Sequence, residues 1–477
     1  RGRAALDAGL LRTIAPPCGG ADVTFTLGAG EDFVVEDSTS TVEHLRIDGD
    51  SGNVSRSGAL FVHTSPFSLS VGFDALAAEV ASGFDTGDAN TAFGHSALLG
   101  TSGGCCYYGQ PFGSSNSAFG KYALAANTSG NGSSAFGASA LRYSTASNSS
   151  AFGWLALRAN TTGFGNDAFG AFALGTNTTG SYNTAFGQSA LGSNGNGSDN
   201  AAFGFTSLVL NSSGSRNAAF GVNALRQNNG NDNAAFGHRA LYANQTGVGN
   251  AAFGRNALAS STTISENSAF GFHALAANTV GSVNAAFGAH ALAANTNGAG
   301  NTAVGHGALA SNTYGSNETA VGYNALSTSL GALRNTAMGS RAAQYTTTGG
   351  DNAAFGMHAL RFNSTGTQNT AVGSQSLDSS TGTSNTALGS SALGGLGSGD
   401  GNIGIGSGGG GSLAVGSNNI YVGNAGQNFE SGKIRIGTSS QTETFITGIS
   451  GNTASGGIAV FVNASHELGT ATSSIRY

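Results

Sequence analysis

The sequence is poor in charged residues. Asp, Glu, Lys and Arg make up 9% of its 477 residues, against about a quarter in an average soluble domain. The 18 Lys and Arg residues form no basic stripe, so we expect no nucleic-acid partner. No apolar run reaches the roughly 18 residues that a membrane-spanning helix needs, so we expect no membrane span.

Cysteine is also scarce, and its count is odd. The three cysteines are Cys18, Cys105 and Cys106. An odd count in a secreted chain indicates pairing between chains or a free thiol. We treat all three as disulfide candidates, with unpaired structural thiols as the alternative.

Glycine and apolar residues are abundant. The chain has 79 Gly and 28 Phe, and 39% of its residues are hydrophobic. Intrinsically disordered chains lack apolar residues and carry a high net charge. The formal net charge here is only −6, so the composition predicts a folded chain with material to bury.

One short repeat dominates the sequence. The segment NTAFGQSAL at 183–191 recurs with small changes, at spacings of 16 or 17 residues after a first gap of 26. Its fourth residue, the anchor, is preceded by Ala and followed by Gly in every copy. The eighteen anchors are Phe93, Phe119, Phe136, Phe152, Phe169, Phe186, Phe203, Phe220, Phe236, Phe253, Phe270, Phe287, Val304, Val321, Met338, Phe355, Val372 and Leu388.

The repeat predicts an all-β fold. A 17-residue unit is too short for a pair of helices, and Gly and Asn in every unit disfavour helix. The unit suits one coil of a parallel β-roll or β-solenoid. We therefore expect about eighteen coils of 16–17 residues, stacked at the strand spacing of about 4.8 Å, with the repeated Asn side chains forming hydrogen-bonded ladders.

Side-chain alternation along the strand suggests which residues are interior. We expect the anchor and the Leu five residues later to share the interior of each coil, after a bend at the Gly. The expected core residues are Phe186, Leu191, Phe203, Leu208, Phe220, Leu225, Phe253, Leu258, Phe270, Leu275, Phe287 and Leu292. The small residues would then face a neighbouring chain, as trimer contacts at Ala252, Gly254, Ala269 and Gly271.

Candidate chemistry is sparse in the repeats. His273 and His290 occupy the same slot of successive units, so they are candidate metal ligands, with variable solvent-facing positions as the alternative. Paired carboxylates suited to glycoside hydrolysis are scarce. We expect no cofactor and no enzymatic activity.

The NTAFGxxAL repeats resemble the head repeats of trimeric autotransporter adhesins. The resemblance implies a left-handed parallel β-roll in an intertwined homotrimer. The period of 17 and the Phe anchors depart from that family's shorter repeat and smaller aliphatic residues.

A second resemblance lies at the C-terminus. The segments at 419–451 and 458–477 look like the lead-in to the intramolecular chaperone domain of phage tail fibres and endosialidases. The resemblance implies that Ser473 is the self-cleavage serine. The Lys that this family places five positions later would follow Tyr477, so we expect Ser473 to be inactive here and the chaperone itself to be absent.

These observations divide the chain into five parts. We expect a tail or linking segment at 1–20, an acidic β-region at 21–90, the repeat solenoid at 91–395, a Gly-rich junction at 396–418 and a closing β-neck at 419–477. The nine extra residues of the first gap lie within 101–113 and predict a protruding loop.

The sequence thus predicts a structural fibre or adhesin, a rigid homotrimeric stalk that presents a surface for attachment. It would be extracellular or on a cell surface, and it could extend into a longer filament, with a host-surface or glycan ligand that the sequence does not identify. The alternatives are a receptor-binding tail fibre of phage type, located on a virion, and a polysaccharide depolymerase.

Overall fold

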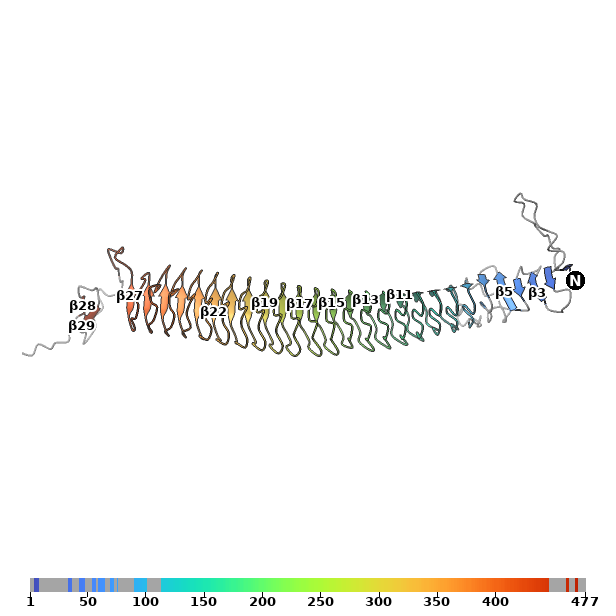
Figure 1. Ribbon diagram of the computed structural model, residues 1–477, viewed down its shortest axis with the longest axis horizontal. Coiled ribbons are helices and arrows are strands. Elements are labelled where there is room, and N and C mark those ends of the chain that lie inside the picture. The colour runs from blue at the N-terminus through green and yellow to red at the C-terminus, as the bar shows by residue number, and fades with distance from the viewer. Residues whose placement is uncertain are drawn as a thin grey trace, which may run out of the picture.

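The computed structural model shows an all-β parallel solenoid of about 19 turns, with no helix among the residues described. The coils stack into a slender, gently curved rod with β3 and β28 toward opposite ends (Figure 1). The structure describes residues 4–7, 33–36, 43–47, 54–56, 59–64, 69–72, 75, 90–100, 113–445, 460–462 and 468–470.

The first strands form a mainly antiparallel sheet. Strands β2 to β6 pair antiparallel in sequence order, while β1 pairs parallel with β2. The sheet continues into the solenoid where β6 pairs parallel with β7. The bounds are β1 Ala4–Asp7, β2 Phe33–Glu36, β3 Glu43–Ile47, β4 Val54–Arg56, β5 Ala59–Thr64, β6 Leu69–Val71 and β7 Thr91–Phe93.

Each further anchor ends a three-residue strand that pairs parallel and in register with the strands of the neighbouring coils, so that Ala aligns with Ala and anchor with anchor. These strands are β8 Ser117–Phe119, β9 Ser134–Phe136, β10 Ser150–Phe152, β11 Asp167–Phe169, β12 Thr184–Phe186, β13 Ala201–Phe203, β14 Ala218–Phe220, β15 Ala234–Phe236, β16 Ala251–Phe253, β17 Ser268–Phe270, β18 Ala285–Phe287, β19 Thr302–Val304, β20 Thr319–Val321, β21 Thr336–Met338, β22 Ala353–Phe355, β23 Thr370–Val372 and β24 Thr386–Leu388.

The solenoid continues beyond residue 395, where the sequence suggests a junction. Strands β25 Ile403–Ile405, β26 Ile420–Val422 and β27 Ile434–Ile436 add to the parallel stack. Strands β28 Val460–Val462 and β29 Leu468–Thr470 form a separate antiparallel pair. The Gly-rich segment 396–418 is therefore part of the stack rather than a separate junction.

The glycines of this last part make room for one large side chain. Tyr421 is fully buried in the strand position that Ala holds in earlier coils. A Cβ on Gly410 would lie 2.7 Å from the Tyr421 ring. The Tyr421 hydroxyl donates a hydrogen bond to Glu430 Oε1 at 2.8 Å, so this aromatic residue fills the interior near the C-terminal end of the stack.

The interior differs from the interpretation of the sequence. The middle Ala of each strand is fully buried, whereas the anchor that follows it lies on the outer face, half-buried or exposed. The placement of Phe186, Phe203, Phe220, Phe253, Phe270 and Phe287 in the core is therefore wrong. The leucines are fully buried, at Leu191, Leu208, Leu225, Leu258, Leu275 and Leu292.

The backbone explains this inversion. Successive side chains of a strand point to opposite faces, so a three-residue strand with its middle side chain in the interior directs the other two outward. After the Gly, two residues adopt positive φ, for example Asn256 at 58° and Leu258 at 52°, and this double turn brings Leu258 back to the interior. Ala257 and Leu258 already fill the interior of this coil. The strand can therefore place only the small side chain of Ala252 there.

The four expected trimer contacts are engaged within a single chain. Ala252 and Ala269 have no exposed surface, so their side chains cannot reach another chain. Gly254 and Gly271 have φ of 138° and 145°, a region open to glycine. A Cβ on either one would collide with the backbone carbonyl of the corresponding Gly in the next coil. Close stacking of coils within one chain is therefore sufficient to explain the invariant small residues.

Two columns of buried polar side chains, most of them Asn, run along the stack and confirm the expected ladders. We call the column just before the strands the strand column, which includes Asn200 and Asn217, and the other the turn column, which includes Asn211. Asn200 Oδ1 accepts from Asn217 N at 3.0 Å in the next coil. Both Asn200 Nδ2 and Asn211 Nδ2 donate to Gly214 O, at 2.8 Å each. The columns thus satisfy backbone groups that have no access to water.

The columns divide the surface of each coil into three sides. In the coil of β13, the strand side comprises residues 201–203, the turn side residues 204–210 and the loop side residues 212–216. Asn211 separates the turn side from the loop side, and Asn217 separates the loop side from the next strand.

We predict that Asn200→Ala destabilises its neighbouring coils. The change leaves the buried Asn217 N without its acceptor, at a cost of about 1–3 kcal/mol, while Gly214 O keeps only its hydrogen bond from Asn211 Nδ2. Hydrogen exchange at the Asn217 amide should accelerate. The control is Asn196→Ala on the exposed loop side, which should change exchange little. Equal effects of the two variants would contradict a structural role for the column.

Candidate functional sites on the solenoid surface

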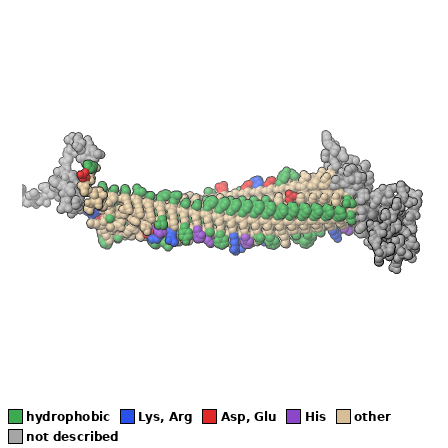
Figure 2. Space-filling model, turned by 90° about the horizontal axis from the view of Figure 1, so that it is seen from above, with side chains coloured by type: hydrophobic (Ala, Val, Ile, Leu, Met, Phe, Trp, Pro, Cys, Tyr) green, Lys and Arg blue, Asp and Glu red, His purple; other side chains and the backbone are tan. Residues whose placement is uncertain are grey.

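A continuous apolar stripe runs along the strand side (Figure 2). Its first part is a stack of twelve phenylalanine rings, from Phe93 to Phe287, which we call the aromatic ridge. Successive ring centroids lie 4.2–5.1 Å apart, with interplanar angles of 4–11°. The rings cover one another's faces, so the outer surface of the ridge consists of ring edges.

Small side chains flank the ridge. On one side is the Gly column, and on the other are the first residues of the strands, which are mostly Ala, Ser or Thr. The anchors beyond Phe287 continue the stripe with aliphatic residues and one further Phe, and several are well exposed, such as Met338 at 44% and Leu388 at 50%. The stripe therefore projects from a flat, small-residue surface.

A signal for this outward orientation is present in the sequence. The anchor itself varies between Phe, Val, Met and Leu, whereas the Ala before it never changes. A cramped interior tolerates one size of side chain, while an outer position tolerates several. Comparing the variability of the two positions would have identified the Ala as the interior residue.

Charge is segregated between the other two sides. Along residues 113–402, eight Lys and Arg lie on the turn side, and its one acidic residue, Asp378, pairs with Arg361 at 2.9 Å. The loop side carries the acids Asp199, Asp232, Glu266, Asp351 and Asp400, with Arg216 and Arg334 paired to two of them. The turn-side cations are Lys121, Arg142, Arg158, Arg226, Arg239, Arg255, Arg341 and Arg361.

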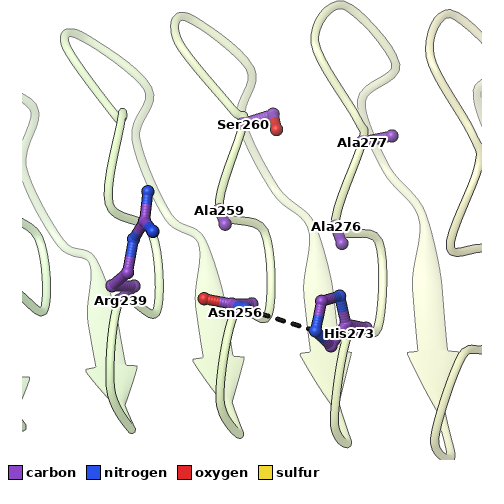
Figure 3. Close-up of a pocket in the computed structure, with 7 residues that line it drawn as sticks. All are labelled: Arg239, Asn256, Ala259, Ser260, His273, Ala276 and Ala277. Atoms are coloured by element: carbon purple, nitrogen blue, oxygen red, sulfur yellow. Dashed lines mark hydrogen bonds between the residues drawn. The ribbon is translucent and has the colours of Figure 1, made fainter.

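The turn side contains a shallow hollow of about 320 Å³ (Figure 3). Arg239, Asn256 and His273 line one bank, one residue from each of three successive coils. The rest of the lining consists of small residues, Ala259, Ser260, Ala276 and Ala277, which follow the buried Leu in two of these coils. Because these side chains are small, the surface of the turn side is hollowed at this point.

The two histidines predicted as metal ligands lie on the turn side. His273 and His290 stack with ring centroids 5.6 Å apart, and His306 follows His290 at 6.0 Å. Asn256 Nδ2 hydrogen-bonds to His273 Nε2 at 3.2 Å, an arrangement in which this ring nitrogen is the acceptor. Residues 90–100 and 113–445 contain no group of three His, Cys, Asp or Glu placed to hold a metal ion.

Among the residues that the structure describes, one acidic residue is fully buried. Glu318 stands in the strand column, where fifteen of the other repeats place Asn before the strand. Its carboxylate accepts hydrogen bonds from Ser329 Oγ at 2.9 and 3.1 Å and from Asn335 Nδ2 at 3.0 Å. Ser329 belongs to the same coil and occupies the turn column, so a smaller side chain there accommodates the longer Glu.

The burial of Glu318 changes its ionisation. Desolvation raises the pKa of this carboxyl to about 7, although the hydrogen bonds from Asn335 and Ser329 favour the charged form. No motif in the sequence identifies Glu318 as a site. The signal that could have identified it is that residues 318 and 329 of the same repeat both differ from the usual Asn.

Several predicted sites cannot be placed. Cys18, Cys105, Cys106 and Ser473 lie outside the described residues, as does the insertion at 101–112. In the described part of the chain, no helix has the length and apolar character needed to cross a membrane.

Comparison with known proteins assigns no family to these features. The chain matches no protein-family model, no curated protein and no solved structure.

We predict that Glu318 makes stability depend on pH. Below its usual pKa of 4.5 the carboxyl is protonated in both folded and unfolded states, and its contribution to stability is complete. As pH rises from about 4.5 through about 7, the unfolded state ionises more readily, and stability should fall by about 3 kcal/mol per chain. Thermal melts of the native chain and Glu318→Gln between pH 4 and 9 measure this loss.

The difference between the two melting profiles isolates Glu318, because all other groups are shared. The profile of Glu318→Gln should be flatter than that of the native chain across this range. Parallel profiles would show that Glu318 ionises in the folded state as it does in water.

Proposed function

We propose that this chain is the subunit of an extracellular homotrimeric fibre, a rigid rod that presents side-chain surfaces for attachment. The observation that carries the proposal is the aromatic ridge. A monomeric soluble protein rarely exposes a contiguous apolar patch beyond a few hundred Å². Twelve stacked rings at about 4.8 Å per coil form a stripe about 50 Å long.

The shape of the ridge supports association around an axis parallel to the rod. The ridge presents one large side chain per coil and small residues on both flanks. Around a threefold axis, each ridge would pack between the other two and against their small flanking residues. Two chains would cover the ring edges but leave the flanks of both ridges in water.

The stacked rings also limit what else could occupy the stripe. Ligands such as sugars bind aromatic residues through the faces of the rings, but here the faces are covered by neighbouring rings. A ridge of ring edges suits a hydrophobic, shape-complementary surface. A second and third copy of the same chain provide such a surface with the same periodicity along its whole length.

We predict that the chain sediments at three times its mass of 46.8 kDa. Phe236→Asp would place three carboxylates around the axis and should shift the population toward monomer, since an unpaired buried charge is strongly unfavourable. The matched control is Phe205→Asp, on the turn side, where the ring is 50% exposed. This variant should remain trimeric.

Analytical ultracentrifugation over a range of concentrations makes the measurement, with circular dichroism to confirm that both variants keep their β-structure. A native chain that is monomeric at every concentration contradicts the fibre proposal. A dimer that Phe236→Asp dissociates would keep the ridge as the interface and refute the threefold arrangement.

A further inference from the structure

The hollow on the turn side lies at one end of a row of ring side chains. Arg239, Asn256 and His273 line the hollow, and ring contacts continue from His273 to His290, His306 and Tyr323, with centroids 5.6, 6.0 and 5.7 Å apart. We call this stretch of the turn side, from the coil of Arg239 to that of Arg341, the turn-side groove. At about 4.8 Å per coil it spans about 30 Å parallel to the rod.

Both ends of this groove are cationic. The Arg239 guanidinium lies 4.5 Å from the Tyr242 ring centroid, and the Arg341 guanidinium lies 5.7 Å from the Tyr323 ring centroid. Arg255, next to Asn256, is exposed. None of these three Arg forms an ion pair with a described residue, in contrast to the two Arg of the loop side. Their guanidinium groups therefore remain available to bind carboxylate or sulfate groups.

The middle of the groove offers neutral polar groups. Desolvation, His290 and Arg255 together lower the pKa of His273, which favours the uncharged form of its ring. Asn256 donates one hydrogen bond to His273. The imidazole of His273 and the hydroxyl of Ser260, beside a low floor of Ala, suit the hydroxyl groups of a sugar.

From this arrangement we propose that the turn-side groove binds a linear acidic polysaccharide lying parallel to the rod, with its carboxylate or sulfate groups on Arg239, Arg255 and Arg341. The cations are too sparse for nucleic acid, which carries a phosphate about every 3.4 Å along each strand. A polymer of sugars with charged groups spaced by neutral ones fits better. The proposal names the ligand class for the attachment role of the fibre and rests on that proposed function, but not on its oligomeric state.

The test measures binding of the full chain to immobilised polymers by biolayer interferometry. The probes are hyaluronate, in which carboxylated and neutral sugars alternate, keratan sulfate, which carries sulfate groups and no carboxylate, neutral dextran and single-stranded oligothymidine. We expect binding to hyaluronate, to keratan sulfate or to both, weakened by salt, and none to neutral dextran. The first two probes distinguish a carboxylated ligand from a sulfated one. Tighter binding of oligothymidine than of either acidic polysaccharide would overturn the proposal, as would binding to none of the probes.

The decisive variant is Arg239→Ala with Arg255→Ala, which should weaken binding about tenfold or more through loss of charge-assisted hydrogen bonds. Its matched control is Arg216→Ala with Arg334→Ala, which removes the same number of charges from the loop side. The control should bind as the native chain does. An equal loss of binding affinity in both double variants would show that only net charge matters. It would overturn the assignment of the binding site to the groove.

Sedimentation of the same double variants separates this proposal from the fibre proposal. A groove variant that loses binding and keeps the native mass supports the groove. A groove variant whose mass changes would place the turn side in the interface between chains and overturn the groove as a ligand site. If the native chain binds none of the probes but sediments as a trimer, the groove proposal is overturned and the fibre proposal stands.

Discussion

Hydrogen bonds from buried asparagine side chains to the backbone of the coils hold this fold together. A coil of 16 or 17 residues has more turn than strand, and its turns leave backbone groups facing an interior without water. Asn200 and Asn211 both reach Gly214 O, and Asn200 also accepts from the next coil. Without these amides, each coil would bury polar groups that nothing else satisfies.

The same columns show what happens when a residue departs from the pattern. Asn244 Oδ1 has no donor because the next coil carries Ser261 in the turn column, and Ser261 Oγ bonds instead to Asn278 O. Glu318 with Ser329 keeps the volume of the site but introduces an ionisable group. The interior therefore tolerates exchange of one or two amides, at the cost of an unsatisfied atom or a titratable one.

A narrow interior also determines the surface. Because two Ala, one Leu and the Asn columns fill each coil, the large anchor has no place inside and lies on the strand side. Because the coils repeat, one exposed Phe in each coil forms a ridge along the rod. In the same way, Arg and His residues of successive coils form a charged side. Function in such a protein depends on columns of residues rather than on a pocket built from distant segments, which is why the proposed interface and groove both run along the rod.

The sequence by itself determined the repeat, its period, the β-solenoid and the asparagine ladders, because these follow from spacing and residue type within one unit. It also indicated buried leucines, since a Leu recurs five residues after nearly every anchor. Tertiary structure decided which side of the strand faces inward. The positive φ of residues such as Asn256 and Leu258 returns the chain to the interior, and that turn cannot be read from alternation along the strand. Stacking likewise decided that Glu318 is enclosed and that Arg239, Asn256 and His273 share a bank, because residues 17 apart become neighbours only when one coil lies on the next.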